Sequence, residues 1–528
     1  MKSLMKRVFA AAAAIATVFG LAATTVATAN AADNATLTVS TTDAKFAGKT
    51  VNAYKMFSAT VSGDGKAVSY TLTDEWKPFF KNSVGLTGVT DENVNDKAND
   101  YVSKLKDSTL VAFATKASNW AQTKANNITA DATATVSADA SNGKYTATFT
   151  GLGYGYYVVA VPGATLANAK SQYATLVSVH STKVDADIKG DLPTVDKKVQ
   201  VDGTGKDATD AKIGDTLTFT LTSTIPDMSA YDTYTFNFKD TLSKGLTFGQ
   251  VKSVKVENVT LTENTDYTVT TPTASNNNTL TVAMKDFKTK QQANAGKKIT
   301  VTYTATLNEN AVVGGAGNVN SAKIQYSNNP STNGTGESEP SKVRVFTYGF
   351  TVDKYTGDQY TDAATRLAGA EFTLAHKDGS AISFVQVSAG SATANAVYRV
   401  AKAGETGTTT ITTPANGKVV FEGLENGEYT LTETKAPAGY NKLASAIGVK
   451  VDVQNNGTDT TNATVTITYN NDNGNDYNQT ASNGVIPVQN KSGAILPGTG
   501  GMGTIAFTVI GVLVIALGVA WTLKRKNA

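Results

Sequence analysis

The stretch FEGLENGEYTL at residues 421–431 places apolar residues alternately on each side of a turn bounded by two glycines. An earlier stretch at residues 149–159, FTGLGYGYYVV, has Phe, Gly, Leu, Gly and Tyr at the same five places. Glycine permits the tight turn, and alternating Leu and Tyr side chains fall on one face of a pleated strand. We therefore expect the same β-hairpin twice, each copy filling the core of its own domain.

The composition around these hairpins favours an all-β protein. Charged residues make up only 17% of the chain, and alternating runs recur between Gly, Asn and Asp turns, as in β-sandwiches. The chain has no cysteine and only two histidines, which argues against a zinc site or a Cys/His nucleophile. We expect no metal, no cofactor and no turnover enzyme.

The length of the chain predicts three domains in tandem. We place them at residues 35–187, 190–344 and 345–491, joined by short connections because no long proline-rich linker is present. Helical periodicity at residues 94–125 predicts some helix within the first domain.

Both ends of the chain have the pattern of export segments. Residues 1–31 combine a basic start, an apolar run and small residues, which predicts a signal peptide cleaved between Ala31 and Ala32. Residues 503–523 are apolar enough to predict a transmembrane segment, with a basic cytoplasmic tail at residues 524–528. Removing both ends takes away six of the 47 basic residues and none of the 44 acidic ones. The remaining chain is slightly acidic, so no nucleic-acid partner is expected.

The pentapeptide LPGTG at residues 496–500 stands just before the apolar run. The order of pentapeptide, apolar run and basic tail resembles the cell-wall sorting signal of Gram-positive surface proteins. In that family a sortase cleaves after the threonine and joins its carbonyl group to an amine. The resemblance implies cleavage between the last two of these residues: Leu496, Pro497, Gly498, Thr499 and Gly500.

The two hairpin copies differ at one inward-facing position, where the later copy has Glu433 and the earlier copy has Val161. A buried carboxylate needs a partner. The sequence LTETKAPAGY at residues 431–440 resembles the collagen-adhesin B-type domain, an immunoglobulin-like module. The resemblance implies an isopeptide bond between Lys354 on the first strand and Asn490 on the last, catalysed by Glu433.

Burial favours the neutral forms of a lysine and of a carboxylic acid, which is what this chemistry requires. A neutral amine can attack the asparagine carboxamide, and a neutral acid can polarise it and relay protons until ammonia leaves. The alternative interpretation is a buried Lys–Glu ion pair without a covalent bond.

The middle domain has a related pattern with different residues. The sequence FKDTLSKGL at residues 238–246 resembles the signature of the A-type pilin domain. The resemblance implies Asp240 as the acid and a bond between Lys197 and Asn320. Their neighbours Lys198 and Asn318 remain alternatives. No crosslink is expected in the first domain, although Lys45 and Lys55 lie on early strands.

Taken together, these features resemble the major (backbone) pilin of sortase-assembled Gram-positive pili. The resemblance implies three immunoglobulin-like domains in a covalent homopolymer on the cell surface, anchored to peptidoglycan. Its partners would be the pilus and housekeeping sortases, identical subunits, minor tip and base pilins, and host or extracellular-matrix ligands. The alternative function is a monomeric wall-anchored adhesin with the same sorting motif.

Polymerisation requires an acceptor lysine. The family often presents it in a Val-Tyr-Pro-Lys sequence, and this chain has no Tyr-Pro-Lys. Lys189 is the favoured candidate because it lies just before the first strand of the second domain, and Lys183 is the alternative.

Overall fold

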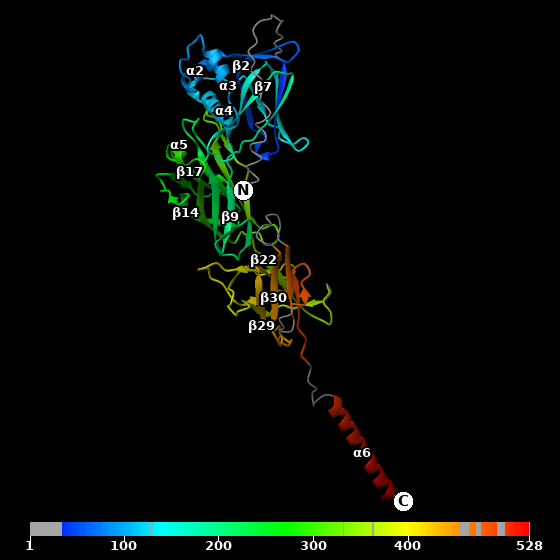
Figure 1. Cartoon of the computed structure of the whole chain (residues 1–528). Coiled ribbons are helices and arrows are strands. Elements are labelled where there is room, and N and C mark those ends of the chain that lie inside the picture. Colours follow the sequence, from blue (N-terminus) through cyan, green and yellow to red (C-terminus); the bar gives the residue numbers. More distant parts are fainter. Residues whose placement is uncertain are drawn as a thin grey trace.

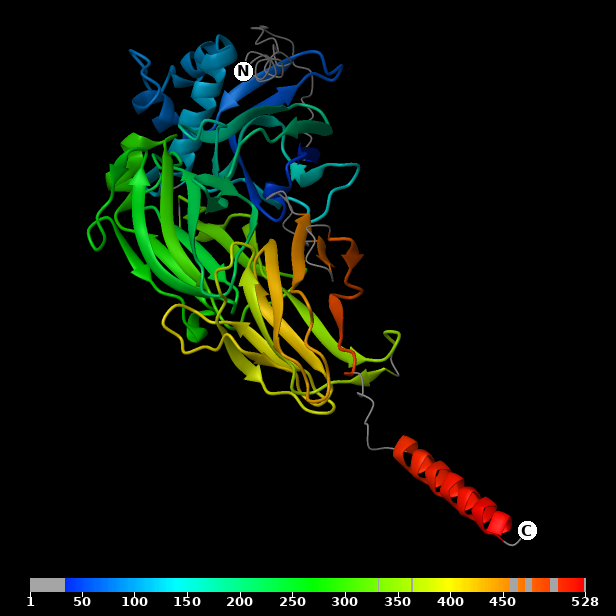
Figure 2. The same ribbon diagram turned by 90° about the horizontal axis from the view of Figure 1, so that it is seen from below.

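The computed structural model describes residues 34–126, 128–330, 332–361, 364–454, 464–470, 477–493 and 502–526. The signal peptide with its cleavage site at Ala31 and Ala32 lies outside the described residues, as does the whole sorting motif from Leu496 to Gly500. Three β-rich domains follow one another along an elongated molecule (Figure 1), and a second view shows the same order (Figure 2).

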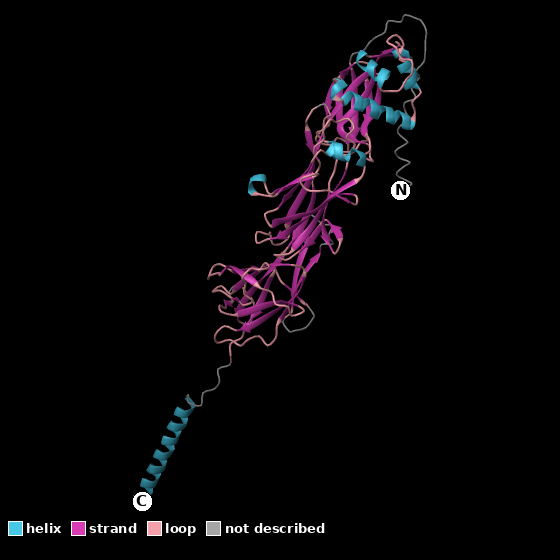
Figure 3. Cartoon of the chain, turned by 90° about the vertical axis from the view of Figure 1, so that its left-hand side faces the viewer, coloured by secondary structure: helices cyan, strands magenta, loops and turns pink. Residues whose placement is uncertain are grey.

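The first domain packs two sheets against each other and carries helices on one side, so the helix predicted at residues 94–125 is confirmed (Figure 3). The sheets have the strand orders β5-β1-β8 and β3-β2-β6-β7, with β4 paired to β2. The helices bury an aromatic cluster that includes Trp76, Phe79 and Phe113. The elements are β1 (Ala35–Thr41), β2 (Thr50–Val61), β3 (Val68–Leu72), α2 (Lys77–Asn82), α3 (Val94–Ser103), α4 (Asp107–Gln122), β4 (Ala132–Thr135), β5 (Tyr145–Leu152), β6 (Gly155–Thr165), β7 (Gln172–Val179) and β8 (Lys183–Asp187).

The middle domain is a β-sandwich of two large sheets. One has the order β10-β9-β12-β18-β14-β15, and the other has the order β11-β21-β19-β13-β17-β16 with β20 paired to β19. The elements are β9 (Asp196–Val201), β10 (Thr204–Lys206), β11 (Ala208–Asp210), β12 (Thr216–Thr224), β13 (Phe236–Leu242), β14 (Leu246–Val256), β15 (Val259–Thr260), β16 (Tyr267–Thr270), β17 (Thr279–Met284), α5 (Phe287–Gln291), β18 (Lys298–Leu307), β19 (Asn318–Ser327), β20 (Thr335–Glu337) and β21 (Ser341–Phe346).

The C-terminal domain is a second sandwich. Its sheets have the orders β23-β22-β28-β26-β25, with β33 paired to β22, and β27-β24-β29-β30-β31-β32. The elements are β22 (Tyr348–Thr356), β23 (Thr365–Arg366), β24 (Glu371–His376), β25 (Phe384–Ser388), β26 (Ala396–Val400), β27 (Ile411–Thr412), β28 (Lys418–Leu424), β29 (Gly427–Lys435), β30 (Ile447–Gln454), β31 (Thr464–Tyr469), β32 (Gln479–Thr480) and β33 (Val485–Gln489).

The repeated hairpin is present in both expected places, as β5–β6 and as β28–β29. Gly151 and Gly423 occupy the same position, one residue before the end of β5 and of β28, with φ of 73° and 83°, a conformation that favours glycine. In each copy the tyrosine hydroxyl donates to a backbone carbonyl four residues earlier, at 2.7 Å, from Tyr157 in the first and Tyr429 in the second. The two terminal domains therefore share a structural core motif.

The first and last strands of these two domains also lie side by side. Strand β1 pairs with β8, and β22 pairs with β33, both in parallel. Parallel neighbours run in the same direction, so the chain enters and leaves each domain in line.

The joints between domains are packed. A segment after β10 reaches the C-terminal domain, where the backbone N–H of Ile213 donates to the carbonyl of Gly423 at 3.0 Å. Asp210 accepts a hydrogen bond from the N–H of Asn426 at 2.7 Å, and Ile213 is buried among apolar residues of that domain. At the other joint, the buried cores of the first and middle domains merge into one apolar cluster.

Helix α6 (Met502–Lys526) follows the three domains in sequence. Within the described part of the chain, no helix combines the length and the apolar character that crossing a membrane requires. The transmembrane segment predicted at residues 503–523 is therefore not confirmed by the structure.

We predict that Gly423→Ala loosens the joint between the middle and C-terminal domains. A β-carbon at Gly423 would lie 2.6 Å from the side chain of Ile213, whereas a β-carbon at Gly151 would meet nothing within 4 Å. Both substitutions carry similar left-handed strain, roughly 1–2 kcal/mol. Hydrogen exchange at the Ile213 amide should accelerate several-fold in Gly423→Ala and stay unchanged in the matched control Gly151→Ala. Equal exchange in both variants would contradict the packed joint.

Candidate functional site

The structure brings Lys354, Glu433 and Asn490 together in the core of the C-terminal domain. Lys354 lies on β22 opposite Val488 of β33, and Asn490 follows two residues later, with its backbone N–H bound to Tyr355. Glu433 comes from β29, which belongs to the facing sheet. The first strand, the last strand and the opposite sheet thus meet at one point.

The three side chains are within reach of one another and out of contact with solvent. Lys354 Nζ lies 3.1 Å from Glu433 Oε1, and both side chains are 0% exposed. Asn490 Nδ2 donates to the other oxygen of Glu433, Oε2, at 3.1 Å. The amide oxygen of Asn490 has no hydrogen-bond partner among the described residues. The carboxyl group therefore sits between the amine and the carboxamide.

The rest of the sequence LTETKAPAGY explains how Glu433 is held. After β29 the chain turns, with Tyr440 N–H bound to the carbonyl of Pro437 and Gly439 at a φ of 87°. The returning segment donates the Leu443 N–H to Glu433 Oε2 at 2.7 Å, and the carbonyl of Asn441 accepts from Asn490 Nδ2 at 2.8 Å. The turn thus positions the acid and the amide.

Burial alters the ionisation of the lysine. Desolvation lowers the pKa of Lys354 from 10.5 to about 8, against the opposing effect of the negative charge on Glu433. The ring of Phe372 lies 5.6 Å from Nζ and forms part of its apolar surroundings. A lysine with this pKa is a neutral amine far more often than a lysine in water.

The middle domain has an equivalent cluster at a different place in its sandwich. Lys197 lies on β9 of one sheet, while Asp240 on β13 and Asn320 on β19 belong to the facing sheet. All three are 0% exposed. Lys197 Nζ is hydrogen-bonded to Asp240 Oδ2, and desolvation lowers the pKa of Lys197 to about 8.

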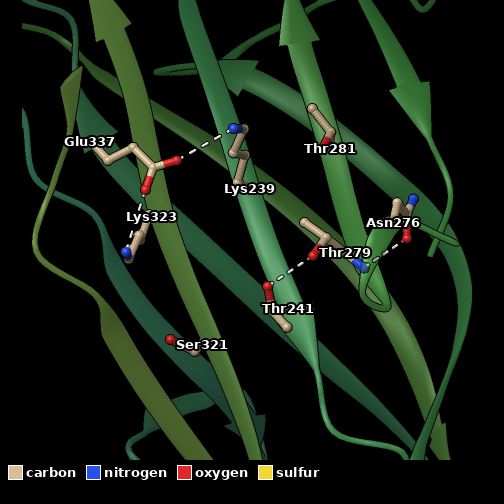
Figure 4. Close-up of a pocket in the computed structure, with 8 residues that line it drawn as sticks. All are labelled: Lys239, Thr241, Asn276, Thr279, Thr281, Ser321, Lys323 and Glu337. Atoms are coloured by element: carbon tan, nitrogen blue, oxygen red, sulfur yellow. Dashed lines mark hydrogen bonds and ion pairs between the residues drawn. The ribbon is translucent and has the colours of Figure 1, made fainter. Parts of the chain in front are cut away.

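The outer face of the same sheet confirms which residues point inward. A cavity of about 410 Å³ is lined there in part by residues that alternate with Asp240 and Asn320 along β13 and β19 (Figure 4). Glu337 binds Lys239 at 3.3 Å and Lys323 at 3.4 Å, so its charge is matched on the surface. The other lining residues are Thr241, Asn276, Thr279, Thr281 and Ser321.

A tyrosine that the sequence analysis did not single out completes the middle cluster. Tyr303 on β18 is fully buried, and its hydroxyl donates to Asp240 Oδ2 at 2.7 Å. The hydroxyl oxygen of Tyr303 also accepts hydrogen bonds, from Lys197 Nζ at 2.9 Å and from Asn320 Nδ2 at 2.6 Å. The alternation in β18 marks Tyr303 as inward-facing, but no sequence motif indicates what it contacts.

The neighbouring alternatives in the middle domain lie elsewhere. Lys198 points away from the core and pairs with Asp207 at 2.6 Å and Asp196 at 3.3 Å. Asn318 is buried, but its amide is bound to the backbone of Val312 and Val345. The geometry thus places Lys197 against the acid and connects Asn320 to the acid through the Tyr303 hydroxyl.

The first domain has the same strand arrangement without the reactive residues. Leu37 pairs with Phe149 on the adjacent strand, and Phe350 pairs with Phe421 in the same way. Thr41 and Lys354 each lie four residues further along the first strand, so they occupy equivalent positions. Continuing the β1–β8 register places Gly190 where Asn490 stands. Lys45 instead pairs with Asp191, and Lys55 lies beside the ring of Tyr157.

The two candidate acceptor lysines are both on the surface. Lys183 begins β8 at the edge of a three-stranded sheet, and Lys189 lies in the connection to the middle domain. Among the described residues, neither amine has a side-chain hydrogen bond or an ion pair. The structure does not distinguish between them.

A second buried charge in the C-terminal domain was also missed from sequence. Asp353 is 0% exposed and binds Arg366 Nε at 2.7 Å and the hydroxyl of Tyr360 at 2.8 Å. These contacts hold the segment after β22 against the outer side of that strand, next to Lys354. In the described ranges no cluster of His, Cys, Asp or Glu has the composition of a metal site.

Two domains match known protein families. Residues 213–330 match the family of the Gram-positive pilin backbone subunit 2, Cna-B-like domain. Residues 358–467 match the SpaA family, a prealbumin-like fold domain. The matched ranges contain Asp240, Tyr303, Asn320 and Glu433.

Among known proteins, the "Trypsin-resistant surface T6 protein" of Streptococcus pyogenes serotype M6 is 26% identical over 280 residues. The match covers 48% of this chain and 44% of that relative, so the chain spans less than half of the relative's length. The solved T6 backbone pilin of the same organism is 18% identical with a TM-score of 0.46, covering 88% of this chain and 99% of that one. The full-length major pilin SpaD of Corynebacterium diphtheriae is 20% identical with a TM-score of 0.39, covering 88% and 98%.

We predict that stability of an Asn490→Ala variant rises with pH above 8. With no asparagine to react with, Lys354 stays an amine whose pKa is about 8 in the folded state and about 10.5 when unfolded. Between these values the unfolded state binds more protons, so the free energy of unfolding increases with pH. Below pH 8 both states are protonated and this dependence disappears.

Urea unfolding at a series of pH values measures the effect. Lys354→Met, which has no amine to titrate, is the control and should lack the rise between pH 8 and 10.5. Parallel curves for the two variants would show that Lys354 has an ordinary pKa.

Proposed function

We propose that this chain is the backbone subunit of a covalent surface pilus, stabilised by isopeptide bonds between Lys354 and Asn490 and between Lys197 and Asn320. One observation carries the proposal: each of the two domains that match pilin-associated families buries a lysine, an acid and an asparagine in one hydrogen-bonded cluster, which in the middle domain includes Tyr303. A buried ion pair alone is weak support for stability, which makes a reaction between these groups the better explanation.

The reaction in the C-terminal domain follows from the contacts. Transfer of a proton from Lys354 to Glu433 gives a neutral amine and a neutral acid in a site without water. Nζ attacks the side-chain carbonyl carbon of Asn490, and the acid donates a hydrogen bond to the developing negative oxygen. One proton then passes from Nζ through Glu433 to Nδ2, and ammonia leaves. The enzyme-like step occurs once per molecule, so the protein is structural.

The bonds would protect the domains against mechanical load. Because β22 and β33 are adjacent and parallel, pulling on the chain ends would act directly on a bond between Lys354 and Asn490. The bond also constrains the unfolded chain, and for loops of ~100 residues the disulfide model gives about 4–5 kcal/mol. In this chain without cysteine, the isopeptide bonds would supply the stabilisation that disulfides give to other exported proteins.

The polymer would form through the sorting motif. In the proposal a pilus sortase cleaves after Thr499 and transfers its carbonyl group to Lys189 of the next subunit, or to Lys183. A housekeeping sortase then joins the finished fibre to peptidoglycan on the surface of a Gram-positive cell. Minor tip and base pilins and host or extracellular-matrix ligands would be its further partners.

We predict that Glu433→Ala and Asp240→Ala each prevent one crosslink. Mass spectrometry should show each variant heavier by one ammonia than its sequence change alone requires, and the affected domain should unfold at a lower temperature. The controls are Glu371→Ala, which removes a surface partner of Lys435, and Asp207→Ala, which removes one of the two partners of Lys198. Loss of a crosslink in Asp207→Ala would assign the bond to Lys198 instead.

We predict that Lys189→Arg abolishes polymerisation while Lys183→Arg does not. Arginine keeps the charge but its guanidinium is a poor nucleophile. The measurement is the ladder of covalent multimers that the cells display in denaturing gels, with Thr499→Ala as the control that removes the sorting threonine. Loss of the ladder only in Lys183→Arg would make Lys183 the acceptor. A wild-type chain on the cell wall that forms no ladder would favour the monomeric adhesin.

A further inference from the structure

The two buried clusters differ in how the acid reaches the asparagine. In the C-terminal domain, Glu433 contacts the amine with one oxygen and Asn490 with the other. In the middle domain the acid is Asp240, whose side chain is one methylene shorter. Among the described residues, no hydrogen bond joins Asp240 to Asn320, and Asp240 Oδ1 has no partner.

The hydroxyl of Tyr303 occupies the place of this missing contact. It donates to Asp240 Oδ2 at 2.7 Å and accepts from Asn320 Nδ2 at 2.6 Å. It also accepts from Lys197 Nζ at 2.9 Å, so one oxygen touches the nucleophile, the acid and the leaving group. The ring beside the lysine of the C-terminal cluster is Phe372, which has no hydroxyl.

We propose that Tyr303 is a catalytic residue of the middle-domain crosslink, relaying a proton between Asp240 and the nitrogen that leaves Asn320. The inference rests on the proposed function, because it assigns a role within the bond between Lys197 and Asn320. It explains why a tyrosine accompanies the aspartate and a phenylalanine accompanies the glutamate.

The relay balances in protons. The reaction starts from the neutral amine and neutral Asp240. Nζ forms a bond to the side-chain carbon of Asn320, which leaves a surplus proton on Nζ and a negative charge on the carbonyl oxygen. Nδ2 of the tetrahedral intermediate is now a basic amine, so the Tyr303 hydroxyl turns towards it and gives it a proton. Asp240 returns a proton to Tyr303 and, now a carboxylate, takes the surplus proton from Nζ. The carbonyl re-forms, the bond from carbon to Nδ2 breaks, and ammonia leaves. Tyr303 and Asp240 end as they began.

The surroundings hold the hydroxyl in place and keep it protonated. Phe219 stacks on the Tyr303 ring with centroids 5.3 Å apart and an angle of 19°, and Phe248 lies 6.0 Å away on another strand. Burial, together with the negative charge of Asp240, raises the pKa of Tyr303 well above 10. The hydroxyl therefore acts as a donor whose position is fixed before the reaction, as efficient proton transfer requires.

The test is the rate of ammonia loss in Tyr303→Phe, followed by mass spectrometry of the full chain after refolding from denaturant. We expect the middle-domain bond to form at least about tenfold more slowly. A general acid or base typically contributes more than this, about 10²–10⁴-fold. The C-terminal bond in the same molecule should form at its normal rate and serves as an internal reference. Tyr326→Phe, which removes another buried hydroxyl of the middle domain, is the matched control and should change neither bond.

A double variant separates proton relay from packing. Asp240→Glu lengthens the acid by one methylene, so Tyr303→Phe combined with Asp240→Glu should recover crosslinking by direct contact, as in the C-terminal domain. A folded Tyr303→Phe chain that forms the middle bond at the wild-type rate would overturn the inference. A wild-type chain that lacks the middle bond would instead overturn the proposed function for that domain.

A second measurement covers the case in which Tyr303→Phe does not fold. Replacing all tyrosines by a fluorinated tyrosine keeps the ring and the hydroxyl but makes the hydroxyl more acidic. The rate of the middle bond should change while the rate of the C-terminal bond does not. Equal rates with and without fluorine in the middle domain would contradict the relay.

Discussion

The physical constraint on which the structure depends is the burial of two lysine amines. A lysine shielded from water is expensive unless a carboxyl group faces it, and even a paired charge brings little stability. Lys197 and Lys354 both meet this condition, with Asp240 and Glu433 drawn from the facing sheet of each sandwich. In the proposed reaction, a carboxamide near each pair converts this costly arrangement into a reactive one.

The same constraint links chemistry to architecture. The acid can approach from the opposite sheet only if the sandwich is closed, so the reactive groups meet after folding. In the C-terminal domain the parallel pairing of β22 with β33 brings Lys354 and Asn490 together. The first domain has the equivalent parallel pairing of β1 with β8. Thr41, Val161 and Gly190 stand there in place of the lysine, the acid and the asparagine, so this domain lacks the groups that the proposed reaction needs.

Much of this was predictable from the sequence, for identifiable reasons. The hairpin at residues 421–431 and its earlier copy revealed the β-fold, because glycine and alternating apolar residues encode local geometry. The replacement of Val161 by Glu433 revealed the buried acid. Tyr303 was missed because Asp240 and Lys197 lie far from it in sequence. Asp353 was missed although Tyr360 and Arg366 are close in sequence, because no motif marks their pairing. The insertion of Ile213 beside Gly423 was missed for the same reason, since no local pattern marks a contact between domains.

The most direct test of the account is the intact mass of the wild-type chain from residue 32 to residue 499. We expect a mass lower than the sequence requires by two ammonias. After proteolysis, branched peptides should join Lys197 to Asn320 and Lys354 to Asn490. An unshifted mass would contradict the account and leave two buried ion pairs in place of two covalent bonds.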